Sequence, residues 1–437
     1  MRNALVNNDF TIHSEFQEEY NLPTKIAKYS HIVAVMDFDK EKKLKIAPHL
    51  LKVPKILGNF EKMKVSHAKH TMSRQTGHAI RFLVSHHNYP ESMLATAVVC
   101  EMIGKWFDVM SARGLSMAFH ASNPDENHST VAFLNRFISF YCSLKLHKDQ
   151  QDSFKPTQVG VILSTNGIIQ LKTKLLKSMP FFLPGKCTND PIEQYHGEVR
   201  SINKSPTGTQ FKHCAKSMGV TQYLAKVKGG SYDSEDSSFL IDFDSFRKVL
   251  ENEQNEEEEV IENLLDANIS LENISEKNSL AYLAGMILKR TILKANKVCN
   301  ACSSAFISKE QGTNEDYEDL ISLKEFKNGA LTKPTKIAFE MFYDSEAIFR
   351  SNESVVGQND RLIGNKITTN VLQFLREKFK QVPDCHMDKI FTRFIRARLC
   401  FEGKEKTRNL FEKKSIQKEA EAEANASRTT KALKIVK

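Results

Sequence analysis

A long apolar stripe between residues 90 and 114 constrains the fold of this chain more than any other feature of its sequence. Large apolar side chains recur along it every fourth residue, with a second row beside the first: Leu94, Val98, Met102, Trp106 and Met110, then Val99, Ile103 and Phe107. This spacing places them on one face of an α-helix, which is stable when that face is buried. The stripe therefore predicts a core helix that begins at Pro90-Glu91 and ends near Gly114.

Other segments also repeat apolar residues at helical spacing. They predict helices over residues 65–85, 129–146 and 163–178. Between residues 24 and 57 the apolar clusters are shorter and are interrupted by Pro48 and Pro54, which predicts short helices. Together these segments predict an all-α region in the first part of the chain.

Length, charge and cysteine content narrow the class of protein. A chain of 437 residues is expected to form two or three domains. Its net charge of +9 permits contact with nucleic acid without requiring it. The eight cysteines lack a dense, even spacing, which favours free thiols or a metal site over a disulfide framework. No apolar run approaches roughly 18 residues, so no membrane span is predicted, and no P-loop motif occurs.

The segment from Lys186 to Arg200 begins with residues typical of a helix start. Either Asn189 or Asp190 can serve as N-cap, and Pro191 then stands at the first helical position. Asp190 and Glu193 are three residues apart, so a helix places both carboxylates on one face near its positive end. From these residues alone, an ordinary capped helix with a solvated acidic first turn is the simplest interpretation.

The same segment resembles the D-x-x-E-x-x-F-G-x-x-R motif of the P-element and THAP-domain transposases. As in that family, a polar stretch follows it and ends in Pro206-Thr207 and Gln210-Phe211, although His196 stands where the family has Phe. The resemblance implies that Glu193 is the third carboxylate, and a Mg²⁺ ligand, of an RNase H-like DDE site. It also implies that Asp190 belongs to an adjoining guanine-nucleotide pocket.

A second resemblance concerns residues 62–73, which are similar to the family motif K-M-K-V-x-x-A-x-x-x-x-S in one wall of that pocket. It implies that Lys64, Val65 and Ser73 contact GTP and that Asp108 contacts the guanine base. A carboxylate suits this role because it accepts paired hydrogen bonds from the ring N1–H and the exocyclic amine. Asp108 also falls near the carboxyl end of its predicted helix, where an anion requires a compensating partner.

Two family contacts are replaced in this sequence. The Asn that follows the guanine-binding Asp by three residues is Ser111, and the Lys of the A-P-K-L segment is His49. We therefore expect GTP binding to be weak and assisted by Mg²⁺.

The later part of the chain carries a third resemblance. Ala281-Tyr282-Leu283-Ala284-Gly285, Cys299-x-x-Cys302 and Cys385-His386 are similar to the carboxyl-terminal segment of many transposases of this group. A C-x-x-C pair with a distant Cys and His is an acceptable tetrahedral Zn²⁺ set, with Cys299, Cys302 and Cys385 as candidate ligands. Because Cys385 and His386 are adjacent, we do not expect both to bind. Buried free cysteines are the alternative.

These observations predict a mainly α fold. In it, a helical insertion domain is attached to the residual carboxyl-terminal part of an RNase H-like α/β fold, and a helical carboxyl-terminal region follows. The expected boundaries are a GTP-binding-type insertion domain at 1–180, the RNase H-like helix region at 181–228, an acidic linker at 229–277, the carboxyl-terminal helical region at 278–402, and a basic tail at 403–437 that is disordered or a frayed helix.

The implied function is that of a P-element/THAP-like DNA transposase fragment, which uses two metal ions for strand transfer and is assisted by GTP. In the family an Arg-Asn pair closes the segment of the second catalytic Asp, and here Arg2-Asn3 opens the chain. We therefore expect both Asp ligands and the THAP zinc module to be missing, so that this transposase-like chain does not cleave DNA alone. Transposon-end DNA, GTP and a second copy of the chain are the expected partners, and the nucleus is the expected location.

Two alternatives remain. The chain could be a non-catalytic, transposase-derived protein that binds DNA without sequence preference or dimerises through its helical insertion. It could also be a truncated gene product whose reading frame continues upstream.

Overall fold

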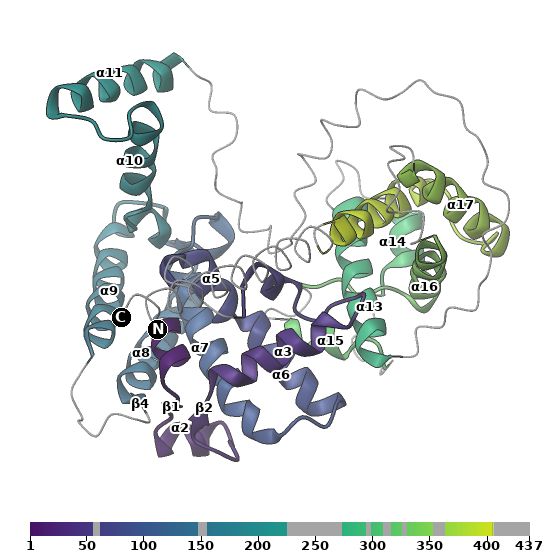
Figure 1. Cartoon of the computed structure of the whole chain (residues 1–437), viewed down its shortest axis with the longest axis horizontal. Helices are drawn as coiled ribbons and strands as arrows, with labels where there is room; N and C mark the ends of the chain where they lie inside the picture. The colour runs from purple at the N-terminus through teal and green to yellow at the C-terminus, as the bar shows by residue number, and fades with distance from the viewer. Residues whose placement is uncertain are drawn as a thin grey trace, which may run out of the picture. The chain divides into compact units, whose positions relative to one another are not determined.

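The computed structural model describes residues 1–55, 62–146, 155–224, 273–293, 299–308, 316–325, 330–352, 363–403 and 405. The chain divides into two compact units, Met1–Phe239 and Leu240–Lys437. Helices form most of each unit, which confirms the prediction of a mainly α fold (Figure 1). The predicted acidic linker as far as residue 272, and the predicted basic tail from residue 406 onward, lie outside the described residues.

The first unit is built from a series of helices and short 3₁₀ turns. In chain order the α-helices are α1 (Arg2–Asn7), α2 (Ser14–Glu19), α3 (Tyr29–Lys40), α5 (Val65–Thr71), α6 (Arg74–His86), α7 (Leu94–Met110), α8 (Pro124–Ser143), α9 (Pro156–Leu175), α10 (Asp190–Ile202) and α11 (Gly208–Leu224). The 3₁₀ turns are η1 (Pro48–Lys52), η2 (Glu91–Met93), η3 (Leu115–Met117) and η4 (Pro184–Cys187).

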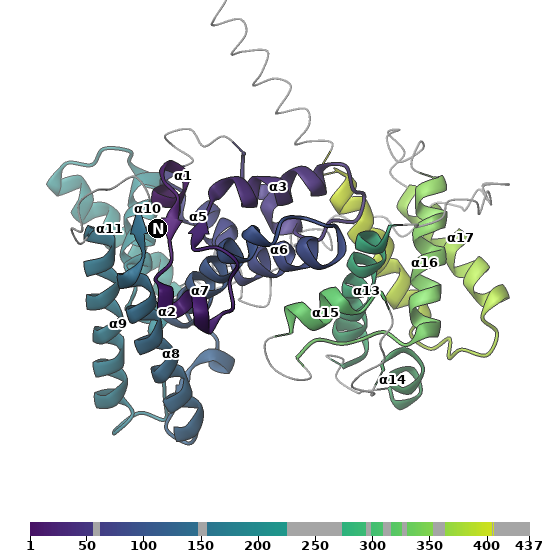
Figure 2. The same cartoon turned by 90° about the horizontal axis from the view of Figure 1, so that it is seen from below.

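Helix α7 forms the centre of this unit, as its apolar stripe predicts. Val98, Val99 and Ile103 are buried, and α6 packs along α7 (Figure 2). The two backbones come very close at Gly104, where an added Cβ would lie 2.5 Å from the backbone nitrogen of Arg74. A glycine is required there because no larger residue fits between the helices.

The predicted end of this helix at Gly114 was wrong. Helix α7 ends at Met110, where Ser111 forms the C-cap, and Gly114 has an extended backbone that precedes η3. The predicted start is nearly right, since η2 begins at Glu91 and leads directly into α7.

The single helix predicted over residues 65–85 is two helices, α5 and α6. The chain breaks at Met72 and Ser73 because the Ser73 hydroxyl accepts a hydrogen bond from the backbone N–H of Thr76 at 3.2 Å and so caps α6. The other two predicted helices exist with earlier starts. Helix α8 begins after the cap residue Asn123. Helix α9 begins with Pro156, and the Gln158 side chain accepts a hydrogen bond from the backbone N–H of Lys155 at 2.9 Å.

All strands in the described residues are two residues long. β1 (Phe10–Thr11) pairs antiparallel with β2 (Ile26–Ala27) and with β4 (Lys145–Leu146), and β3 (Phe119–His120) pairs antiparallel with β5 (Phe181–Phe182). These pairs join loops and form no extended sheet in the described part of the chain. The described portion of residues 181–228 ends in a helical hairpin, α10 and α11, with a small core of Val199, Cys214 and Met218.

The second unit is also helical. It contains α13 (Ile274–Leu288), the π-helical turn η5 (Lys289–Leu293), α14 (Asn300–Phe306), α15 (Asp319–Lys324), α16 (Lys336–Ser351), α17 (Ile363–Lys378) and a helix over 387–403. Helix α13 packs on α16, and Leu280, Ala284 and Phe342 are buried in this unit.

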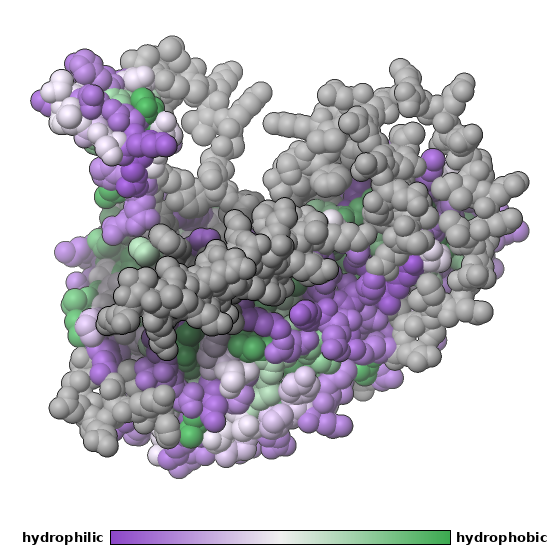
Figure 3. Space-filling model, viewed as in Figure 1, coloured by the Kyte–Doolittle hydropathy of each residue, from purple (hydrophilic) through white to green (hydrophobic). Residues whose placement is uncertain are grey.

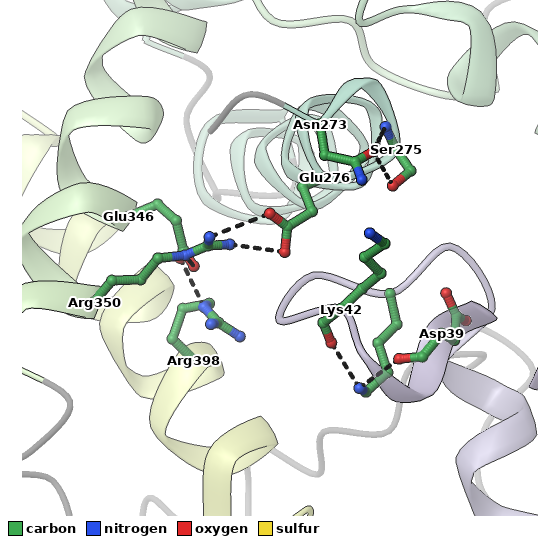
Figure 4. A network of polar contacts seen from close by, with 9 residues as sticks. Asp39, Lys42, Asn273, Ser275, Glu276, Glu346, Arg350 and Arg398 are labelled. Atoms are coloured by element: carbon green, nitrogen blue, oxygen red, sulfur yellow. Dashed lines mark hydrogen bonds and ion pairs between the residues drawn. The ribbon is translucent and has the colours of Figure 1, made fainter. Parts of the chain in front are cut away.

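A buried chain of charges joins three helices of the second unit (Figure 4). Arg350 of α16 donates two hydrogen bonds to Glu276 of α13, at 3.1 and 3.2 Å, and one to Glu346 at 2.9 Å. Arg398, on the last helix, donates to the other oxygen of Glu346 at 2.7 Å. Glu346 and Arg398 are almost completely buried, so each charge depends on its partners.

No helix among the described residues has the length and apolar character needed to cross a membrane. On the face drawn in Figure 3, the described surface is largely hydrophilic, with small and separate hydrophobic patches.

Candidate functional site

The start of α6 and the end of α7 meet in a group of polar residues: His49, Ser73, Arg74, Thr76 and Asp108, called the junction cluster here. His49 is buried, and its Nε2 lies 2.9 Å from the Thr76 hydroxyl and 3.2 Å from the Ser73 hydroxyl. The two hydroxyls lie 3.0 Å apart. The histidine that replaces the family's lysine is therefore held against Ser73, one of the predicted nucleotide contacts.

Asp108 has the compensating partner that its position required. Arg74 donates from both Nε and Nη2 to the same oxygen, Oδ2, at 3.1 and 2.8 Å. The Asp108 side chain is 36% exposed, and Oδ1 accepts no hydrogen bond from other described residues. An oriented carboxylate with one oxygen available at the surface can accept hydrogen bonds from a bound base. Sequence reasoning missed Arg74, although it is the residue directly after the predicted contact Ser73.

Lys64 and Val65 lie at the start of α5. Both side chains are exposed, Val65 to 67%, and the neighbouring Met63 is exposed as well. Helix α5 contacts α7, and the Lys69 ammonium lies 5.7 Å from the centre of the Phe107 ring. The structure thus brings the end of α5, the start of α6 and the end of α7 into one region of the first unit.

Two lysines, Lys69 and Lys105, lie close to this region. Lys105 of α7 lies 4.2 Å from the centre of the Phe133 ring, and burial, followed by the nearby charge of Arg74, lowers the pKa of Lys105. Together with Lys69, it would attract an anionic ligand such as a nucleotide phosphate, whereas Arg74 is already paired with Asp108.

Helix α10 carries Asp190 and Glu193, and the segment before it is tied to the end of α7. The N–H of Gly185 donates to the Ala112 carbonyl at 2.9 Å. Asn189 stands at the N-cap without a side-chain capping bond, and Asp190 is the first residue of the helix. The Glu193 side chain is exposed. Among the described residues, Glu193 belongs to no group of three or more His, Cys, Asp or Glu side chains that could hold a metal ion.

The second unit contains one such group within the described ranges: Cys299, Cys302, Cys385 and His386, called the cysteine–histidine cluster here. Their ligand atoms all lie within 4.8 Å of one another. The Cys385 sulfur lies 3.6 Å from that of Cys299 and 3.0 Å from that of Cys302. His386 Nδ1 lies 3.5 Å from the Cys302 sulfur and 3.4 Å from the Cys385 sulfur.

The expectation that only one of Cys385 and His386 would join the set does not match this geometry. Both residues lie in the turn before the last helix rather than in a strand, where neighbouring side chains would point to opposite faces. The thiols differ in environment. Burial raises the pKa of the Cys302 thiol, whereas a backbone hydrogen bond from Cys302 lowers the pKa of Cys299.

Two family models match this chain. Residues 3–122 match the TNP-like, GTP-binding insertion domain, and residues 270–397 match the C-terminal domain of DNA transposase THAP9. Together they cover more than half of the chain. The chain belongs to the P-element and THAP9-like DNA transposases.

Comparison with solved structures gives a partial match. This transposase relative is similar to the Drosophila P element transposase strand transfer complex, with 20% sequence identity and a TM-score of 0.42. The match covers 51% of this chain and 49% of the other, so the chain spans about half of the length of that protein. No curated protein matches this transposase relative.

Proposed function

We propose that this transposase relative binds GTP at the junction cluster and the start of α5, and that it acts on DNA in P-element-type transposition. The observation that carries the proposal is the match of residues 3–122 to a GTP-binding insertion domain. Four of the five proposed nucleotide contacts, Lys64, Val65, Ser73 and Asp108, fall within the matched residues. The fifth, Asp190, follows a segment anchored to the end of α7.

The junction cluster suggests how guanine would be selected. Asp108 offers the oxygen that Arg74 leaves available, Oδ1, whose two lone pairs can accept from two donors. Guanine presents two donors side by side, N1–H and the exocyclic amine. Adenine presents an amine beside an unprotonated ring nitrogen. That nitrogen is an acceptor, so it could not donate a hydrogen bond to the carboxylate. Arg74 would orient the carboxylate as a positioning residue.

In this proposal Glu193 supplies one carboxylate to a DNA-processing centre. Two-metal phosphodiester chemistry uses cations that activate the attacking oxygen and stabilise the leaving oxygen. One carboxylate cannot hold two Mg²⁺ ions, so Glu193 would act with further carboxylates. Because the proposed substrate is DNA, we expect the protein to be located in the nucleus.

Titration calorimetry in the presence of Mg²⁺ tests the nucleotide proposal. We expect measurable heat with GTP and a much weaker response with ATP. Asp108→Asn replaces the carboxylate with an amide that has only one acceptor oxygen. This variant should therefore bind GTP about tenfold or more weakly than the wild type. No heat at millimolar GTP, or equal affinity for GTP and ATP, would contradict the proposal.

A second candidate is non-catalytic DNA binding by the helical hairpin of α10 and α11. The observation that favours it is a set of exposed basic side chains on that hairpin: Arg200, Lys204, Lys212 and Lys216. Contacts from such residues to phosphates release counterions and make affinity fall steeply with salt. DNA binding that weakens with salt and does not respond to GTP would favour this candidate, in which the helical insertion could also form a dimer.

A further inference from the structure

The cysteine–histidine cluster has the donor set and spacing of a closed tetrahedral metal site. A tetrahedral zinc ion with bonds of about 2.3 Å to sulfur and 2.0–2.1 Å to nitrogen separates two sulfurs by about 3.7 Å and a sulfur from a nitrogen by about 3.5 Å. The observed separations are 3.0 and 3.6 Å between sulfurs, and 3.4 and 3.5 Å between sulfur and Nδ1.

We propose that Cys299, Cys302, Cys385 and His386 bind one zinc ion, with His386 Nδ1 as the fourth ligand. Three thiolates and an imidazole suit Zn²⁺ and disfavour Mg²⁺ or Ca²⁺, which prefer oxygen ligands. With all four ligands supplied by the protein, no coordination position is left for a substrate. The ion therefore has a structural role.

The connections of the four residues indicate what this ion stabilises. Cys299 caps α14 and Cys302 lies within it, whereas Cys385 and His386 immediately precede the last helix, 86 residues further along the chain from Cys299. That last helix carries Arg398, which is buried against Glu346 of α16. The zinc ion would hold α14 to the start of this helix, so the folding of the second unit would depend on metal.

A disulfide between Cys302 and Cys385 is the competing interpretation, since their sulfurs lie only 3.0 Å apart. A disulfide would use only two of the four residues. It would not explain why Cys299 lies close to Cys385, or why His386 lies close to the sulfurs of Cys302 and Cys385. A single ion accounts for all four positions.

The test uses the full chain, purified under reducing conditions, and measures its zinc content by elemental analysis. We expect one zinc per chain in the wild type and none in Cys302→Ser or Cys385→Ser. Cys400→Ser is the matched control, since Cys400 lies on the last helix outside the cluster, and it should retain zinc. Zinc retained by Cys302→Ser, or absent from the wild type, would overturn the proposal.

Replacing zinc with Co²⁺ tests the ligand set without depending on stability. The wild type should show the intense visible bands of tetrahedral cobalt and sulfur-to-cobalt charge transfer. His386→Ala should keep the charge-transfer bands and shift the visible bands, because three thiolates remain and the nitrogen ligand is lost. An unshifted spectrum would exclude His386 as a ligand. A Cys302–Cys385 disulfide found by mass spectrometry in the freshly purified, unreduced chain would support the competing interpretation instead.

Discussion

Arg74 binds Asp108 through two donors that reach a single carboxylate oxygen, at 3.1 and 2.8 Å, across the contact between α6 and α7. The Arg74 guanidinium therefore contacts Asp108, the residue proposed to bind guanine. The Arg74 side chain is the less exposed of the two, at 18% against 36%. Its role in the proposed site is therefore to position Asp108 rather than to contact the base.

Replacing Arg74 with Gln should weaken GTP binding without abolishing it. The carboxylate would remain but would lose the cation that orients it, and a charge-assisted hydrogen bond of this kind is worth about 1.5–3 kcal/mol. Because the pair is partly exposed, solvent screening reduces this effect, and we expect a loss of affinity of about threefold to tenfold in calorimetry.

Arg81→Gln is the control for that variant. Arg81 forms a comparable pair with Glu101, at 2.6 and 2.9 Å, further along the same two helices. The Arg81→Gln variant should lower the free energy of unfolding about as much as Arg74→Gln does, and it should leave GTP affinity unchanged. If both variants reduced GTP affinity equally, Arg74 would affect binding only through the stability of the fold and not by positioning Asp108.

Gly104→Ala should destabilise the first unit. An added Cβ would lie 2.5 Å from the Arg74 nitrogen and 2.9 Å from the Ser73 carbonyl carbon, both of which are backbone atoms that cannot turn aside. We expect a loss of about 1–3 kcal/mol in the free energy of unfolding, measured with urea. Gly160→Ala in α9 is the matched control. Its Cβ would meet nothing within 4 Å, so the helix should gain about 0.5–1 kcal/mol. Equal changes in both variants would contradict the close approach of α6 and α7.

The features that sequence predicted best are those set by local periodicity. The stripe along α7 predicts a buried helix because apolar spacing alone determines which face is covered. The break between α5 and α6 was missed since the apolar spacing continues across it, and only the Ser73 cap, a hydrogen bond to Thr76, interrupts the helix. The end of α7 was placed at Gly114 because glycine often ends helices, yet the chain leaves the helix at Ser111.

Contacts between distant residues were harder to predict. The need for a partner of Asp108 followed from its position near a helix end, but the identity of Arg74 depends on how α6 crosses α7. From the sequence, the adjacency of Cys385 and His386 argued against both residues binding one metal ion. The turn that lets both side chains converge has no clear sequence signal, so this geometry could not be predicted. Family resemblance supplied the candidate residues, and tertiary packing determined their partners.

Glu346→Gln should strongly destabilise the second unit. Glu346 is fully buried between Arg350 and Arg398, and the change leaves both guanidinium groups without their shared anion. Removal of one member of a buried ion pair costs about 3–5 kcal/mol. Urea unfolding, followed by a probe in the second unit, measures the loss. Arg376→Gln, which removes an exposed pair with Asp384 and Asp388, should change stability little. A small effect for Glu346→Gln would show that water reaches the network.

Acidification should destabilise the first unit through His31. Burial lowers the pKa of His31 from its ordinary value of 6.5, the charge of Lys28 lowers it further, and Asp9 opposes the change. Its Nδ1 lies 2.8 Å from the Thr96 hydroxyl, which already accepts a hydrogen bond from the Lys28 N–H at 2.9 Å. The same hydroxyl donates to the Lys28 carbonyl at 3.5 Å, and the direction of its bond with His31 depends on the imidazole tautomer. Because burial favours the neutral ring, protonation of His31 costs stability in the folded chain.

The direction of the effect follows from proton binding. Since the folded pKa lies below the unfolded one, the unfolded chain binds more protons once the pH falls below about 6.5. The contribution of His31 to stability is complete above that pH and declines as the pH decreases towards the folded pKa. His31→Gln keeps a hydrogen-bonding partner for Thr96 and cannot titrate, so it should flatten the fall in stability below about pH 6.5. His196→Gln, at an exposed position in α10, is the control and should leave the slope as it is. Identical slopes in wild type and His31→Gln would assign the acid sensitivity to other groups.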